Sequence, residues 1–137
     1  MSQTGNISRN ILIADDEAVI ADTLAAIFKQ KGYNAASVHS GEEAVVAAQS
    51  AEPDVLISDV VMGEISGVAA AVLIQQRFPR CKVILLSGYA VPIDQLTSAT
   101  VDGLIFDFLQ KPVHPEVLLQ HVKGLEFNAH KEHIDSV

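Results

Sequence analysis

Residues 56–63 read LISDVVMG, an apolar run that ends in a single carboxylate, Asp59. Short apolar runs rich in β-branched residues are typical of strands covered by helices on both faces of a parallel sheet. The chain contains five such runs: Ile11–Ala14, Tyr33–Val38, Val55–Ser58, Lys82–Leu86 and Leu104–Leu109. A lone acid at the end of a buried strand is either the first residue of a loop or a residue placed there for chemistry.

Helical patterns lie between these runs. The first ends near Gly32, and Ser40 with Glu43 three residues later has the spacing of a capping box that opens the second. Pro115 fits the first turn of the last helix. The connection from Pro92 to Val101 is poor in helix-forming residues, so we expect a short or mobile helix there. Alternating strands and helices predict a doubly wound α/β domain.

Length and composition limit the possible classes of protein. The 137 residues fit one domain, predicted over residues 9–125, with residues 1–8 and 126–137 as short polar tails. No apolar run approaches the roughly 18 residues of a membrane span, and the polar start does not resemble a secretory signal. A single cysteine, Cys81, suits a reducing cytoplasm. The net charge of −8 argues against autonomous DNA binding.

Polar residues follow four of the five predicted strands: Asp15 and Asp16, Asp59, Ser87 and Lys111. Because parallel strands end at one edge of the sheet, we expect these side chains to converge there. Carboxylates about 5 Å apart repel by about 3 kcal/mol per pair at an effective dielectric near 20. Lys111 offsets part of this charge, and a hard cation such as Mg²⁺ would offset more. In that setting Asp59 can act as a nucleophile toward a phosphoryl group.

Each of these residues also has a simpler interpretation. Asp15 or Asp16 could cap the following helix, and Lys111 could be a solvated loop residue. Ser87 could bond only to loop backbone, and Phe108 follows a pattern that indicates a core position. The five histidines show no metal-ligand spacing, and we interpret them as structural or solvated, with Cys81 as a buried apolar residue.

Four segments together resemble the receiver domain of two-component response regulators: ILIADDE, LISDVVMGEISG, ILLSGYA and FDFLQKP. The resemblance spans about residues 9–125 and implies a flavodoxin-like (βα)5 fold with strand order 2-1-3-4-5. It implies a cytoplasmic phosphorelay switch, which is not an enzyme with a separate substrate. The partner would be a sensor histidine kinase or a histidine phosphotransfer protein, and contact with nucleic acid or membrane is not expected. A dimer that forms on phosphorylation remains open.

The resemblance also assigns roles to residues. Asp59 would become the 4-aspartylphosphate, with Mg²⁺ held by Asp16, Asp59 and the backbone carbonyl of Val61, and Asp15 would assist through water. Lys111 would contact the phosphoryl group. Two further residues would transmit the signal: Ser87 as the switch hydroxyl and Phe108 as the switch aromatic. The Lys111–Pro112 peptide bond would be cis.

Several positions depart from the commonest family pattern. Gly63 stands in place of a frequent proline, and we expect a looser loop there. Ser87 replaces threonine but keeps the hydroxyl, whereas Phe108 replaces tyrosine and has no phenolic oxygen. Val61 and Tyr89 occupy rim positions at which the family tunes the lifetime of the phosphate. None of these changes removes a reacting group.

Two other classes of function are weighed against a receiver. An aspartyl-nucleophile phosphatase would need a second acid two residues after Asp59 to protonate the leaving group, and that position is Val61. A flavodoxin-like cofactor binder would need a phosphate-cradling loop, but ADDEAV follows the first strand and would repel phosphate without a metal. With no output domain expected after the last helix, the signal would leave through protein contacts.

Overall fold

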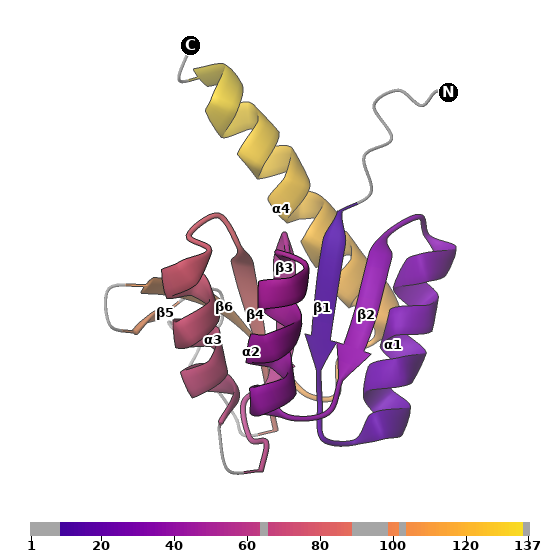
Figure 1. Cartoon of the computed structure of the whole chain (residues 1–137). Helices are drawn as coiled ribbons and strands as arrows, with labels where there is room; N and C mark the ends of the chain where they lie inside the picture. Colours follow the sequence, from indigo (N-terminus) through magenta and orange to yellow (C-terminus); the bar gives the residue numbers. More distant parts are fainter. Residues whose placement is uncertain (1–8, 64–65, 89–98, 102–103, 136–137) are drawn as a thin grey trace.

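A six-stranded sheet forms the centre of the molecule (Figure 1). The computed structural model describes residues 9–63, 66–88, 99–101 and 104–135. The sheet order is β2-β1-β3-β4-β6-β5, and the first five strands in this order are parallel. Strand β6 is the fifth parallel strand along the chain, so this arrangement confirms the predicted parallel order 2-1-3-4-5. The strands are β1 (Asn10–Ala14), β2 (Asn34–Val38), β3 (Val55–Asp59), β4 (Lys82–Ser87), β5 (Ala99–Val101) and β6 (Leu104–Gln110).

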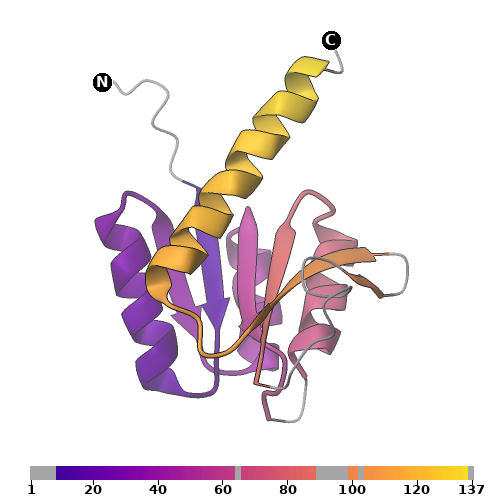
Figure 2. The ribbon, with the colours of Figure 1, turned by 180° about the vertical axis from the view of Figure 1, so that it is seen from behind.

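Helices cover both faces of the sheet (Figures 1 and 2). The helices of the described ranges are α1 (Ala18–Gln30), α2 (Gly41–Ser50), α3 (Gly67–Arg77) and α4 (Pro115–Asp135). Helices α1 and α4 pack on one face, where Phe28 and Val122 join Ile13 and Ile57 in a buried cluster. Helices α2 and α3 pack on the other face. Because both faces are buried, alternate residues of each central strand enter different clusters, and the strands read as continuous apolar runs.

Local sequence signals explain several helix ends. Gly32, just after α1, has φ +96°, a left-handed conformation that glycine adopts readily. The Ser40 hydroxyl accepts the Glu43 N–H at 3.0 Å and opens α2, and Ser66 caps α3 in the same way through Ala69 N–H at 3.1 Å. Helices α2 and α3, which these serines cap, both begin at the sheet edge where the parallel strands end.

The structure corrects two expectations about less regular segments. Residues 99–101, predicted within a short helix, form β5, which pairs antiparallel with β6. Thr100 and Val101 are β-branched and favour a strand when a partner is available; the rest of that connection, residues 92–98, lies outside the described residues. Helix α4 continues to Asp135, so residues 126–135 are helical where a polar tail was predicted. No helix in the described ranges has both the length and the apolar character needed to cross a bilayer.

Candidate functional site

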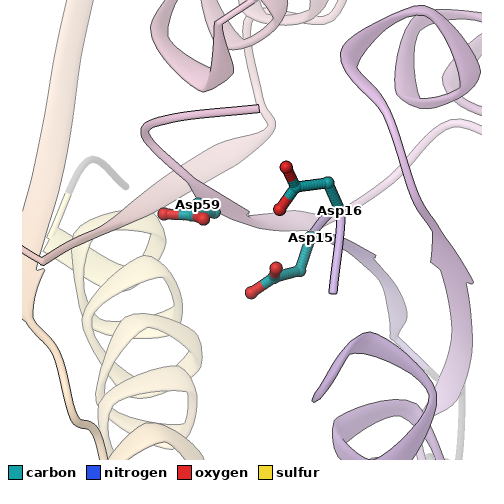
Figure 3. Close-up of side chains that lie close together, drawn as sticks. All are labelled: Asp15, Asp16 and Asp59. Carbon is teal, nitrogen blue, oxygen red and sulfur yellow. The ribbon is translucent and has the colours of Figure 1, made fainter. Parts of the chain in front are cut away.

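Three aspartates converge where β1 and β3 end, as Figure 3 shows. Ala14 closes β1 and is paired with Ser58, so Asp15 and Asp59 emerge side by side from neighbouring parallel strands. Carboxylate oxygens of Asp15, Asp16 and Asp59 lie within 4.8 Å of one another. Asp15 and Asp59 are buried, whereas Asp16 is exposed. The sequence prediction that these three acids gather at one edge of the sheet is confirmed.

Lys111 lies between two of these acids. Its Nζ is 3.2 Å from Asp59 Oδ2 and 3.4 Å from Asp15 Oδ2. Partial burial alone would lower the pKa of Lys111, but the hydrogen bonds and charges of Asp59 and Asp15 outweigh it and raise the pKa above the ordinary value. The ammonium therefore stays charged and offsets part of the repulsion among the acids.

The backbone fixes the position of Lys111. Its N–H donates to the Ser87 carbonyl at 2.7 Å, which attaches the residue after β6 to the end of β4. The Lys111–Pro112 peptide bond is cis, so this expectation from the family resemblance is confirmed. The backbone of Lys111 is thus held at the end of the sheet by a hydrogen bond to β4, and its ammonium reaches the acidic cluster from that fixed position.

Asp15 combines a structural and an electrostatic role. Its Oδ1 accepts the N–H of Glu17 at 2.9 Å, while its Oδ2 faces Lys111. The simpler interpretation, in which Asp15 or Asp16 caps the following helix, is not confirmed, because Glu17 is the N-cap of α1 and no side chain bonds to the first turn there. One carboxylate oxygen of Asp15 accepts the backbone N–H at the start of α1, and the other faces the Lys111 ammonium, which Asp59 also contacts.

The carboxylate cluster has the donor chemistry of a magnesium site. Mg²⁺ binds oxygen ligands and is usually held by one or two carboxylates with water. Three carboxylates within 4.8 Å of one another provide such ligands, and among the described residues Lys111 is the one ammonium in contact with them, which leaves a surplus of negative charge. The residues present therefore fit the cation that the sequence suggested.

Ser87 and Phe108 lie on adjacent strands and on the same side of the sheet. Ser87 is buried at the end of β4, and it is paired with Gln110, two residues beyond Phe108. Phe108 is half-buried and packs against the cluster beneath α2 and α3, so the core interpretation of its ring holds in this structure. Side chains two apart on a strand share a face, so Ser87 and Phe108 are near neighbours across the β4–β6 pair.

The loop after Asp59 contains two residues that the sequence singled out. Val61 is exposed, with 60% of its surface accessible. Gly63 has φ +44°. Proline fixes φ near −65°, so the proline common at this position would not fit the turn seen here. Tyr89, the other residue expected at the rim, lies outside the described residues.

A residue that sequence reasoning missed is Gly67, the first residue of α3. A Cβ placed on it would lie 1.8 Å from the Asp59 carbonyl oxygen, so only glycine fits. Its N–H also donates to the Val60 carbonyl at 2.7 Å. A glycine at a helix start has several explanations in sequence alone, and this close approach is visible only in the folded chain.

Two histidines make structural contacts away from the acidic cluster. His39 Nε2 lies 3.0 Å from Asp22 Oδ1, and His121 Nε2 lies 3.0 Å from Asp107 Oδ2. Cys81 is buried, and its burial raises the pKa of the thiol to about 12. At neutral pH this thiol stays protonated and unreactive.

Comparison with known proteins agrees with the geometry of the site. Residues 11–123 match the family model described as the response regulator receiver domain. Among similar proteins are the transcriptional regulatory protein YvrH of Bacillus subtilis, 30% identical over 116 residues, and the regulatory protein VanR of Enterococcus faecium, 29% identical over 120 residues. These alignments cover 84% and 86% of this chain but 48% and 50% of the relatives. The chain thus spans about half the length of these curated relatives.

Solved structures show the same architecture. The CheY-like receiver domain protein of Methanospirillum hungatei superposes with a TM-score of 0.80 at 22% identity, covering 92% of this chain and 99% of that one. The chemotaxis regulator CheY4 of Vibrio cholerae gives 0.71 at 26% identity, covering 87% and 99%. The match to the receiver-domain family over residues 11–123 does not support the alternative of an aspartyl-nucleophile phosphatase.

Proposed function

This chain belongs to the response regulator receiver domain family, and we propose that Asp59 is the residue on which it accepts a phosphoryl group. Receiver domains take this group from histidine kinases or phosphotransfer proteins and act as signalling switches. The observation that carries the proposal is the position of Asp59: a buried carboxylate that closes β3, faces Lys111 at 3.2 Å and stands among two further acids.

The surroundings of Asp59 suit an in-line transfer. A carboxylate oxygen of Asp59 attacks phosphorus, the bond from phosphorus to the donor nitrogen or oxygen breaks, and an acyl phosphate forms on Asp59. Negative charge gathers on the phosphoryl oxygens during this step, and Lys111 is already held where it can pair with them. Lys111 thereby exchanges a carboxylate partner for a phosphoryl partner with little movement.

We propose that Asp16, Asp59 and the backbone carbonyl of Val61 hold Mg²⁺, with Asp15 assisting through water. The supporting observation is the cluster of carboxylate oxygens, which combines hard donors with unbalanced negative charge. When bound, the cation neutralises charge on the acids and on the incoming phosphoryl oxygens. The exposed position of Asp16 leaves that side of the cluster open to solvent, from which a hydrated ion and a phosphodonor can enter.

The change on phosphorylation is proposed to pass through Ser87 and Phe108. In this hypothesis, the Ser87 hydroxyl binds the phosphoryl group, the end of β4 moves inward, and Phe108 turns into the space that is left; residues 89–98, which follow, lie outside the described residues. Support comes from the strand register, which puts Ser87 and Phe108 on one face of neighbouring strands. Because Phe108 has no phenolic oxygen, the switch would depend on packing and not on a hydrogen bond from that ring.

A protein partner is proposed to dock at the edge that carries the acids. Val19 in the first turn of α1 is 78% exposed, and Val117 in the first turn of α4 is 53% exposed. Both helices begin at the carboxyl edge of the sheet, the edge that carries the acidic cluster, so these exposed apolar side chains are available to a kinase or phosphotransfer protein that approaches this edge. We place this exchange in the cytoplasm and propose a switch with no separate substrate.

Labelling with a small phosphodonor tests the acceptor assignment. Incubation with acetyl phosphate and Mg²⁺ should add one phosphoryl group by intact mass, and Asp59→Asn should abolish the addition because an amide is a poor nucleophile. Asp54→Asn is the matched control. Asp54 lies just before the opposite end of β3 and accepts the Asn10 N–H at 2.7 Å, so this variant should label like the unmodified chain. Equal labelling of Asp59→Asn would refute the assignment.

A further inference from the structure

A buried hydroxyl lies directly beneath the proposed acceptor. Ser58 precedes Asp59 in β3 and is 1% exposed. Its Oγ donates to the carbonyl oxygen of Asp59 at 3.0 Å, and Met62 Sδ lies 4.0 Å away. The Ser58 hydroxyl is therefore hydrogen-bonded to the backbone of the acceptor residue itself.

The position of Ser58 in the sheet would otherwise favour an apolar residue. By strand alternation its side chain shares a face with Leu56, which lies in the buried cluster beneath α2 and α3. Across the sheet Ser58 is paired with Ala14 on β1 and Leu85 on β4, both also in that cluster. A hydroxyl at such a position costs free energy unless it is hydrogen-bonded, so its presence points to a task at the Asp59 carbonyl.

Helix α3 holds the same peptide from the other side. The place where Gly67 would carry a Cβ is 1.8 Å from the Asp59 carbonyl oxygen and 2.9 Å from Ser58 Oγ. The next carbonyl, that of Val60, accepts the Gly67 N–H at 2.7 Å. The carbonyls of Asp59 and of the next residue, Val60, are thus both fixed, the first by a side-chain hydroxyl and the second by the first N–H of α3.

We propose that Ser58 is a positioning residue for the phosphoryl-acceptor site. Its hydroxyl fixes the orientation of the Asp59 peptide, and through it the direction of the Asp59 side chain and the course of the backbone toward the Val61 carbonyl. The inference rests on the proposed function, in which Asp59 and the Val61 carbonyl are ligands of Mg²⁺. Without the hydroxyl, the same ligands remain but are less well oriented.

Magnesium affinity without any phosphodonor tests this role. We expect Ser58→Ala to keep the circular dichroism spectrum of the unmodified chain and to weaken Mg²⁺ binding about tenfold, the lower end of what loss of an outer-sphere partner costs a metal site. Amide NMR shifts during a Mg²⁺ titration measure the dissociation constant. Labelling by acetyl phosphate should slow at limiting Mg²⁺ and recover at saturating Mg²⁺, which separates poor orientation of the ligands from loss of the acceptor.

Ser40→Ala is the matched control, because it removes the hydroxyl that caps α2 and so destabilises the fold without contacting Asp59. It should leave Mg²⁺ affinity unchanged. Equal affinities of Ser58→Ala and the unmodified chain would overturn the inference, as would equal weakening in both variants. If Ser58→Ala does not fold, Ser58→Cys replaces it, and an unchanged dissociation constant in that variant would also overturn the inference.

The proposed function can fail separately. If the unmodified chain neither binds Mg²⁺ nor labels, the assignment of the site is wrong whatever the Ser58 variants show. If it does both while Ser58→Ala behaves identically, the site assignment stands and only the role of Ser58 is lost.

Discussion

Gly67 illustrates how much a single backbone position contributes to the site. Its Cα lies against the carbonyl of Asp59, and its N–H bonds to the next carbonyl, so the first residue of α3 is in contact with the acceptor loop. The residues at the strand ends could be predicted because each follows an apolar run. Gly67 could not, because its constraint is a contact between two elements and leaves no local pattern.

Replacing Gly67 with alanine should destabilise the fold. The new methyl group would meet the Asp59 backbone, which cannot move aside by changing rotamer, so we expect a loss near the upper end for overpacking, about 3 kcal/mol. Urea denaturation measures this loss. Gly124→Ala is the control: a Cβ there meets nothing within 4 Å, and alanine is favoured over glycine in helix α4 by about 1 kcal/mol. Equal stabilities of the two variants would contradict the proposed contact.

At the scale of elements, α1 and β2 are joined by a polar cluster of three residues. Asp22 Oδ1 accepts the Ser37 hydroxyl at 2.6 Å and lies 3.0 Å from His39 Nε2. The hydrogen bond to Asp22 is the main reason that the pKa of His39 is raised above 6.5. The hydrogen bonds from Ser37 and then His39 lower the pKa of Asp22. The sequence interpretation of His39 as a structural or solvated residue agrees with this role.

The Asp22–His39 contact predicts a pH dependence. Because the pKa of His39 is raised on folding, its pairing stabilises the fold fully below about pH 6.5 and is lost as the pH rises through the raised value. NMR titration of the His39 ring should show Asp22→Asn bringing this pKa down toward 6.5, while Asp54→Asn leaves it unchanged. An identical titration curve for His39 in Asp22→Asn would show that the contact is not formed in solution.

The helices and strands differ in how far their own sequences predict them. Helices α1, α2 and α3 follow apolar stripes and clear end signals, such as Gly32 after α1 and the Ser40 cap of α2. Strand β5 exists because β6 offers it a partner, which a local pattern cannot show. Residues 126–135 of α4 carry no apolar stripe, so the extension of this helix to Asp135 could not be predicted from a pattern of apolar residues.

Over the whole molecule, the fold gathers more negative than positive charge at the carboxyl edge of the sheet. The chain carries a net charge of −8, and three of its acids gather at one edge of the sheet beside a single contacting ammonium in the described part of the chain. Doubly wound sheets bring strand ends together whatever residues those ends carry. The predicted strand order was therefore enough to say which residues meet at the site. The distances between their charged atoms are visible only in the folded structure.

Magnesium should accordingly stabilise the entire domain. A ligand that binds only the folded state at about ten times its dissociation constant adds about 1.4 kcal/mol. Thermal unfolding should therefore shift to higher temperature in Mg²⁺ but not in KCl of matched ionic strength. Asp16→Asn should reduce the shift because it removes a proposed ligand without disturbing the Asp15 and Asp59 contacts to Lys111. An equal shift in KCl would indicate general screening of charge.

Strand β5 has a consequence for self-association. It pairs with residues 104–106 of β6 and so occupies the outer hydrogen-bonding groups along the first part of that strand. A sheet edge with free backbone groups is a template on which another chain can add a strand, and short capping strands suppress such growth. The receiver can therefore expose this side to other proteins through its side chains with less risk of polymerising through its backbone.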